Sequence, residues 1–253
     1  SVFKAIKKGD GERYIIPAKL RPWKEGDEMD YVLHYDIESY RVEYGKSIPN
    51  AVGWIWRGVY KYLVGDDCMA RFVDMVLNNI EYKDCVYLNA FNGASFDHLM
   101  FINAIEKMGR ITDCKWLKTS RGIISCTIGK DKYTSSKKNG KIVKDYEWRA
   151  KNLIDISCHL NGSLGKNLKD FGCEVQKGTF DHEKNCKDIT GKDLEDLLFY
   201  LEKDVRGLKE LSEKLHKTMI EKYKTSWVHF VSTSSFAFGV WTNMIKDELA
   251  NIP

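Results

Sequence analysis

Two carboxylates stand one residue apart near the end of an apolar stretch, YVLHYDIESY at positions 31–40. The residues around them are the β-branched, aliphatic and aromatic types that favour a buried strand. Because side chains alternate along a strand, Asp36 and Glu38 should point to the same face, with Cα atoms roughly 7 Å apart. Two like charges on one buried face are unfavourable. The pair therefore predicts either a strand end at the surface or a cation bound between the acids.

The pair is weak evidence alone, because about five acid-x-acid triplets are expected by chance in a chain with this many acids. One such match is DHE at 181–183. A metal site therefore needs support from elsewhere in the chain.

A second motif, NAFNGASFDHLM at 89–100, reads as an apolar strand, a turn at Asn92-Gly93 and a helix with Asp97 in its first turn. The helix dipole favours an Asp there, so simple capping is one interpretation. The other is a third carboxylate delivered beside the first strand. In that case Asn92 and Phe96 are groups for hydrogen bonding to, and stacking on, a base or sugar.

A third motif, YLEKD at 200–204, lies in a segment with a leucine stripe at helical spacing. Tyr200 and Asp204 are four residues apart and so share one helix face. Asp204 precedes Val205 of the apolar stripe, which places it at the border of the core. It is either an ordinary surface residue or a partly buried acid that shares a metal with Asp36 and Glu38.

Taken together, DIE, NGASFD and YLEKD resemble the three motifs of the DEDD 3′–5′ exonucleases, and in particular the proofreading domain of family B DNA polymerases. Position 199 is Phe, where the histidine-bearing subclass has His, so the resemblance is to the tyrosine subclass. The segment from 155 to 183 resembles the protein-primed branch of viruses and linear plasmids. The segment 231–241 looks like its connection toward the palm domain, but palm motifs are not found here. The chain is therefore expected to be an excised domain or a free-standing relative.

The resemblance implies a ribonuclease H-like α/β fold and a site with two Mg²⁺ or Mn²⁺ ions, which lie ~3.5–4 Å apart in two-metal enzymes. The ions would be held by four acids: Asp36, Glu38, Asp97 and Asp204. It also implies that Tyr200 orients the attacking water and that Lys177 is catalytic at the scissile phosphate.

The implied substrate is a single-stranded DNA 3′ end, which loses nucleoside 5′-monophosphates, with polymerase domains in cis if the chain is a fragment. By the same resemblance Ser163 and Leu164 contact single-stranded DNA, although Ser163 also suits a plain helix N-cap. Two alternatives stay open: an exoribonuclease of the same architecture, since specificity depends on the 2′-OH, and a non-catalytic nucleic-acid-binding module.

The pattern of elements predicts an α/β domain with a mixed sheet flanked by helices. Three regions are expected: an N-terminal extension over 1–30, an exonuclease domain over 31–220 and a helical connection over 221–253. Strands are predicted near 13–18, 31–37, 85–91 and 152–157, one or two strands over 51–65, and a strand–turn–strand over 116–129. Helices are predicted near 66–83, 193–217 and 235–249, and a turn followed by a helix over 92–109. The lysine-rich stretch 130–151 carries a turn signal at Asn139-Gly140 and is either a solvated hairpin or a phosphate contact.

The bulk composition narrows the class only slightly. A net charge of +4 is too small to identify a nucleic-acid partner. No apolar run approaches the ~20 residues of a membrane helix, and no signal peptide is visible, so no membrane partner is expected. The cysteine count is odd, at seven, and no CxxC spacing occurs. This favours idle thiols in a reducing, intracellular compartment, which can be cytoplasmic, mitochondrial or viral.

Overall fold

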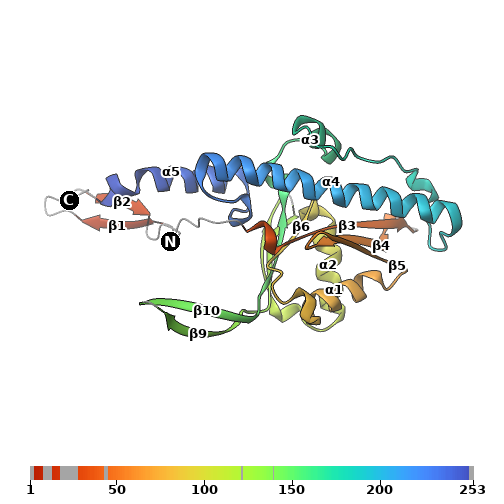
Figure 1. Cartoon of the computed structure of the whole chain (residues 1–253), viewed down its shortest axis with the longest axis horizontal. Helices are drawn as coiled ribbons and strands as arrows, with labels where there is room; N and C mark the ends of the chain where they lie inside the picture. Colours follow the sequence, from red (N-terminus) through yellow and green to blue (C-terminus); the bar gives the residue numbers. More distant parts are fainter. Residues whose placement is uncertain are drawn as a thin grey trace.

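The computed structural model describes residues 3–7, 13–17, 28–42, 45–120, 122–138 and 140–250. Its centre is a seven-stranded mixed sheet in the order β5-β4-β3-β6-β11-β8-β7 (Figure 1). The bounds are β3 Val32–Arg41, β4 Ser47–Trp56, β5 Val59–Val64, β6 Tyr87–Ala90, β7 Cys114–Thr119, β8 Gly122–Ile128 and β11 Lys151–Asp155. Strand β6 runs parallel to both β3 and β11, and the other pairs are antiparallel.

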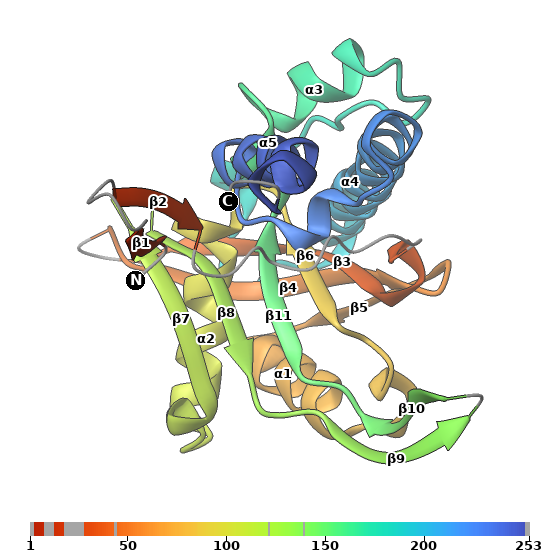
Figure 2. The ribbon, with the colours of Figure 1, turned by 90° about the vertical axis from the view of Figure 1, so that its left-hand side faces the viewer.

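Helices cover both faces of this sheet (Figure 2). One face carries α1, Cys68–Asn78, and α2, Asp97–Lys107, and the other carries the long α4, Gly191–Tyr223. Helix α3, Leu164–Asp170, contacts α4, and α5 spans Thr233–Ala250. Short 3-10 turns connect these elements: η1 Met29–Tyr31, η3 Ile80–Tyr82, η4 Gly93–Ser95, η5 Ile111–Asp113, η6 Ile156–His159, η7 His182–Lys184 and η8 Trp227–His229.

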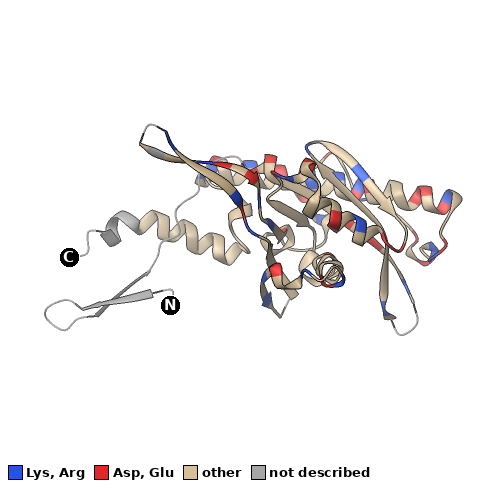
Figure 3. Cartoon of the chain, turned by 90° about the horizontal axis from the view of Figure 1, so that it is seen from below, with Lys and Arg blue, Asp and Glu red and all other residues tan. Residues whose placement is uncertain are grey.

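Two further strand pairs lie outside the central sheet. Strands β1, Phe3–Lys7, and β2, Arg13–Pro17, pair antiparallel. Strands β9, Lys132–Lys138, and β10, Lys141–Trp148, form a hairpin that projects away from the sheet. Figure 3 shows separate basic stretches along this hairpin, together with acidic and uncharged ones. The hairpin predicted for 130–151 is therefore present, and its described side chains are mostly exposed.

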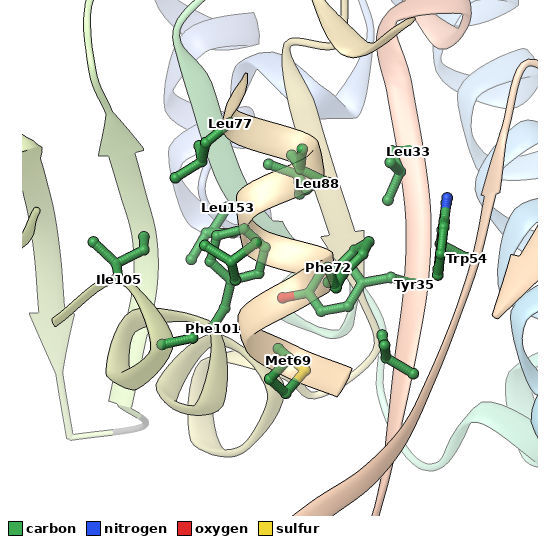
Figure 4. Packing of buried hydrophobic residues seen from close by; sticks show 14 of the residues in the cluster. Leu33, Tyr35, Trp54, Met69, Phe72, Leu77, Leu88, Phe101, Ile105 and Leu153 are labelled. Atoms are coloured by element: carbon green, nitrogen blue, oxygen red, sulfur yellow. The ribbon is translucent and has the colours of Figure 1, made fainter. Parts of the chain in front are cut away.

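The main core explains which way the acids of β3 face. Leu33, Tyr35 and Ile37 alternate with polar residues and are buried in one cluster with Phe72 of α1 and Phe101 of α2 (Figure 4). The Tyr35 and Phe72 ring centroids are 5.6 Å apart. Because successive side chains alternate, Asp36 and Glu38 are turned to the opposite face, toward α4.

The predicted mixed α/β sheet flanked by helices is confirmed. The apolar stretch at 51–65 forms two strands, β4 and β5, and the helix predicted for 193–217 is longer at both ends. The division into three regions stays a prediction. None of the helices in the described ranges has both the length and the apolar character that a bilayer span needs.

Candidate active site

Strand β3 carries Asp36 and Glu38 past the end of its pairing with β6. The ladder between β3 and β6 covers only Val32 to His34, after which β6 turns away. On the other side, Asp36 pairs with Gly53 of β4 and Glu38 with Ala51. Glu38 is buried, whereas Asp36 is half-buried. The open edge of β3 therefore presents both carboxylates to a cleft while their backbone stays anchored in the sheet.

Helix α4 adds Tyr200 and Asp204 on one buried face, as their spacing predicts. The helix can pack closely because residue 53 of β4 is glycine: a Cβ there would meet Leu201 Cγ at 2.9 Å. A second glycine, Gly178, passes over Tyr200, where a Cβ would lie 3.1 Å from Tyr200 Cδ2. The lack of side chains at these two positions brings α4, β4 and the loop of Lys177 together around the acids.

Asp97 is the first residue of α2 and is 3% exposed. It does not serve as a side-chain cap, because the N-cap position is Phe96 and no side-chain cap bond forms. Its Oδ1 atom is buried without a hydrogen-bond partner, and so is Oδ1 of Asp204. Burial raises the pKa of Asp97 well above its usual range, and the charge of Asp36 raises it further. Asp97 is thus electrostatically part of the same cluster.

Burial and mutual repulsion shift the titration of the β3 acids. Burial, followed by the charge of Asp204, raises the pKa of Asp36 to about 7. Burial, followed by the charges of Asp36 and Asp204, raises the pKa of Glu38 to about 9. Burial and the Asp204 charge also raise the pKa of Tyr200, so its hydroxyl stays protonated at neutral pH. These carboxylates need a counter-charge to be ionised together.

A lysine and a histidine reach the cluster from the segment before α4. Lys177 Nζ lies 3.2 Å from Asp204 Oδ2, and the ammonium also lies 5.5 Å from the centre of the Tyr200 ring. His182 Nδ1 lies 3.8 Å from Glu38 Oε2, and its ring packs edge-on against Tyr200. The ion pair places Lys177 beside the acids, and its catalytic role stays a prediction.

These groups face a cleft of about 1470 Å³. Its lining includes Asp36, Glu38, Lys177, Tyr200 and Asp204, together with all four residues expected to contact nucleic acid: Asn92, Phe96, Ser163 and Leu164. Ser163 is also the N-cap of α3, because its hydroxyl accepts from Lys166 N at 3.3 Å. Leu164 is 7% exposed and belongs to a buried cluster that also contains Leu208 and Leu211 of α4.

The cleft also contains residues that the sequence analysis did not single out. Asp155 and Ser157 lie at the end of β11, and His182 and Glu183 belong to the DHE triplet that composition alone explains. Asp155 could have been found by noting that it is the one acid inside the predicted strand 152–157. His182 has no local signal, because its role depends on how the loop before α4 folds over β3.

The donor set suits a hard divalent cation, because it consists of carboxylate oxygens and two of these are buried without partners. Within the described ranges, however, no three acidic, histidine or cysteine side chains converge as a preformed metal-binding group. One of the acids, Asp204, is instead paired with the Lys177 ammonium. The carboxylate oxygens of these acids therefore fit a metal ion by their chemistry, whereas the described side chains are not yet arranged around a common point.

The raised pKa values predict how stability depends on pH in the metal-free chain. The folded pKa of Asp36 and of Glu38 lies above the unfolded value, so the folded state binds more protons between about pH 4 and about pH 9. The contribution of these two groups to the free energy of unfolding is therefore present at acidic pH, and it is lost as the pH rises through about 7 and about 9. In EDTA, we compare the melting temperature of the unmodified chain with that of the Asp36→Asn, Glu38→Gln variant. The difference, unmodified chain minus variant, should fall between about pH 5 and about pH 9.

Added Mg²⁺ should reverse this loss for the unmodified chain at about pH 8, because a ligand that binds only the folded state stabilises it. The neutral variant serves as the control and should not respond to Mg²⁺. An equal rise in the melting temperature of both proteins would contradict a cation site at these acids.

The fold is similar to that of solved DNA polymerases. Phi29 DNA polymerase complexed with primer-template DNA and incoming nucleotides matches with a TM-score of 0.53 and 18% identity over 77% of this chain and 32% of that chain. Phi29 DNA polymerase complexed with single-stranded DNA matches with a TM-score of 0.50 and 18% identity over 76% of this chain and 35% of that chain. The chain thus spans about a third of the length of these relatives. No protein-family model matches the sequence, and the search of curated proteins found no match.

Proposed function

We propose that this chain is a metal-dependent 3′–5′ exonuclease of the proofreading type, acting in the setting of a family B DNA polymerase. The observation that carries the proposal is the convergence of Asp36, Glu38, Tyr200 and Asp204, from β3 and α4, on one cleft. Asp97 of α2 is buried near enough to Asp36 for the charge of Asp36 to raise its pKa. The fold that this chain shares with phi29 DNA polymerase supports that setting.

The four carboxylates Asp36, Glu38, Asp97 and Asp204 would hold Mg²⁺ or Mn²⁺. Bound there, two such ions supply an activated water and charge stabilisation at the scissile phosphate. The protein contributes the acids at fixed positions: two on one strand face, one at a helix start and one on a buried helix face. Because a cation would offset their repulsion, its binding should favour the fully ionised cluster.

Tyr200 and Lys177 act on the other reactants. The Tyr200 hydroxyl is protonated at neutral pH, as in an ordinary tyrosine, and its raised pKa extends this to higher pH. It would therefore orient the attacking water by hydrogen bonding without serving as the base. Lys177 is partly exposed, and its ammonium lies at the acids. It can therefore turn toward a phosphate that enters the cleft and balance its charge.

The substrate strand would run between two walls of the cleft. Asn92 and Phe96 lie on the wall after β6, and Ser163 and Leu164 lie on the wall at the start of α3. The half-buried Phe96 ring can stack on a base or sugar, an interaction worth ~1–3 kcal/mol per base. A single strand suits these contacts, because its bases are free to stack. The phi29 enzyme was solved with single-stranded DNA, which supports this choice of substrate.

The direct test compares 5′-labelled single-stranded DNA and RNA of equal sequence, with Mg²⁺ or with EDTA. We expect the DNA to shorten one nucleotide at a time from its 3′ end, to release nucleoside 5′-monophosphates, and to stay intact in EDTA. Faster trimming of RNA than of DNA would make the chain an exoribonuclease. Binding of either strand without cleavage in Mg²⁺ and in Mn²⁺ would contradict the enzyme and favour a binding module.

A further inference from the structure

Asp155 is a buried acid at the cleft to which the proposed function gives no role. It is the last residue of β11, it is 4% exposed and it lines the cleft. Its carboxylate accepts three backbone N–H groups: Oδ1 from Asn92 at 3.0 Å and from Ser157 at 2.9 Å, and Oδ2 from Ala94 at 3.0 Å. One side chain therefore fastens both the turn after β6 and the turn after β11.

The turn after β6 contains a residue in an uncommon backbone conformation. Asn92 has a φ of 61°, in the left-handed region that non-glycine residues seldom occupy. Its side chain is held as well, because Asn92 Oδ1 accepts from Ser95 Oγ at 3.0 Å. With the oxygen engaged, the amide nitrogen is the group left to donate into the cleft. Asp155 and Ser95 thus fix the backbone and the amide of a residue placed to contact the substrate.

The turn after β11 is also held by a hydrogen bond to a second buried residue. Asn89 of β6 is fully buried, and its Oδ1 accepts from Ile156 N at 3.2 Å. Its Nδ2 donates to Ser212 Oγ of α4 at 3.0 Å. The first two amides of η6 are therefore held by Asn89 and by Asp155, so this wall of the cleft is tied to α4, the helix that carries Tyr200.

Asp155 differs from the four proposed metal ligands in how its oxygens are used. Both are engaged by backbone donors, whereas Asp97 and Asp204 each keep a buried oxygen without a partner. A carboxylate that satisfies three amides is suited to holding a loop. We propose that Asp155 is a positioning residue that sets the path of the substrate strand through Asn92 and the neighbouring turn. This proposal rests on the proposed exonuclease function.

The Asp155→Asn variant tests the idea, because it keeps the shape of the side chain but turns an amide N–H toward a backbone donor. We expect the KM for a single-stranded DNA substrate to rise about tenfold, with a kcat that falls by less than about threefold. Affinity for Mn²⁺ should stay at the level of the unmodified chain. The matched control is Asp131→Asn at the base of the β9–β10 hairpin, where Asp131 Oδ1 also accepts a backbone amide, that of Ala150 at 2.8 Å.

Two results would overturn the proposal. An unchanged KM, equal to that of the control, would leave Asp155 a residue of the fold alone, and lost Mn²⁺ binding would make it a fifth metal ligand. If Asp155→Asn does not fold, Ser95→Ala replaces it, since Ser95 is exposed and its hydroxyl contacts only Asn92, at the backbone O and at Oδ1. A raised KM for this variant would support the proposal, and an unchanged KM would refute it. Should the unmodified chain neither bind nor cut DNA, the proposed function itself has failed, and this inference with it.

Discussion

The Asp36→Ala, Glu38→Ala double variant is expected to show no exonuclease activity above background in Mg²⁺ or Mn²⁺. The two side chains supply half of the proposed metal-binding carboxylates, and both come from the same strand face. Removing them takes away the ligands and the charge that would hold the ions. Activity is measured as the shortening of 5′-labelled single-stranded DNA, with protein that has been freed of contaminating nucleases.

The double variant should remain folded, because β3 is anchored by its other face and by its ladder with β4. In EDTA its melting temperature should be higher than that of the unmodified chain, since clustered like charge has been removed. Strand β10 offers a matched control: Asp145 and Glu147 have the same acid-x-acid spacing on an exposed hairpin. Asp145→Ala plus Glu147→Ala should keep full activity. Activity retained in the Asp36, Glu38 variant would remove both acids from the site.

The sequence was most informative where a function depends on residues close together in the chain. Asp36 and Glu38 share a strand face, and Tyr200 and Asp204 share a helix face, because the periods of the two structures dictate it. The convergence of these two elements could not be worked out from local patterns. It depends on the close approach of α4 to β4 at Gly53, a glycine that looks ordinary in the sequence.

The residues missed by the sequence analysis share a different feature. Asp155 gains its role from amides of Asn92 and Ala94, more than sixty residues earlier in the chain. His182 reaches Glu38 across a loop. Ser163 caps α3 and also lines the cleft, so the cap does not exclude the predicted contact with a DNA strand. Side chains that act through tertiary contacts leave no periodic signal, so they were visible only once the fold was known.

Tyr200→Phe is expected to slow the chemical step while leaving the affinity for metal and for DNA nearly unchanged. The ring is buried between the segment of Lys177 and His182 and the acids, so phenylalanine should fill the same space. Only the hydroxyl is lost. Its raised pKa keeps it protonated, which limits it to orienting water and excludes it as a base. Positioning and proton-transfer groups contribute about 10²–10⁴-fold, and a group that only orients water should lie at the low end.

The measurement is a single-turnover rate on single-stranded DNA with saturating enzyme and Mg²⁺, so that neither binding nor product release limits it. We expect a rate about 10²-fold lower for Tyr200→Phe. Tyr223→Phe, at the exposed end of the same helix, is the matched control and should react at the unmodified rate.

The pH dependence adds a second criterion. If Tyr200 acted as a base, its removal would change the shape of the pH–rate profile; if it only orients water, the profile should keep its shape and shift down as a whole. A single-turnover rate equal to that of the unmodified chain would leave Tyr200 as a packing residue of α4.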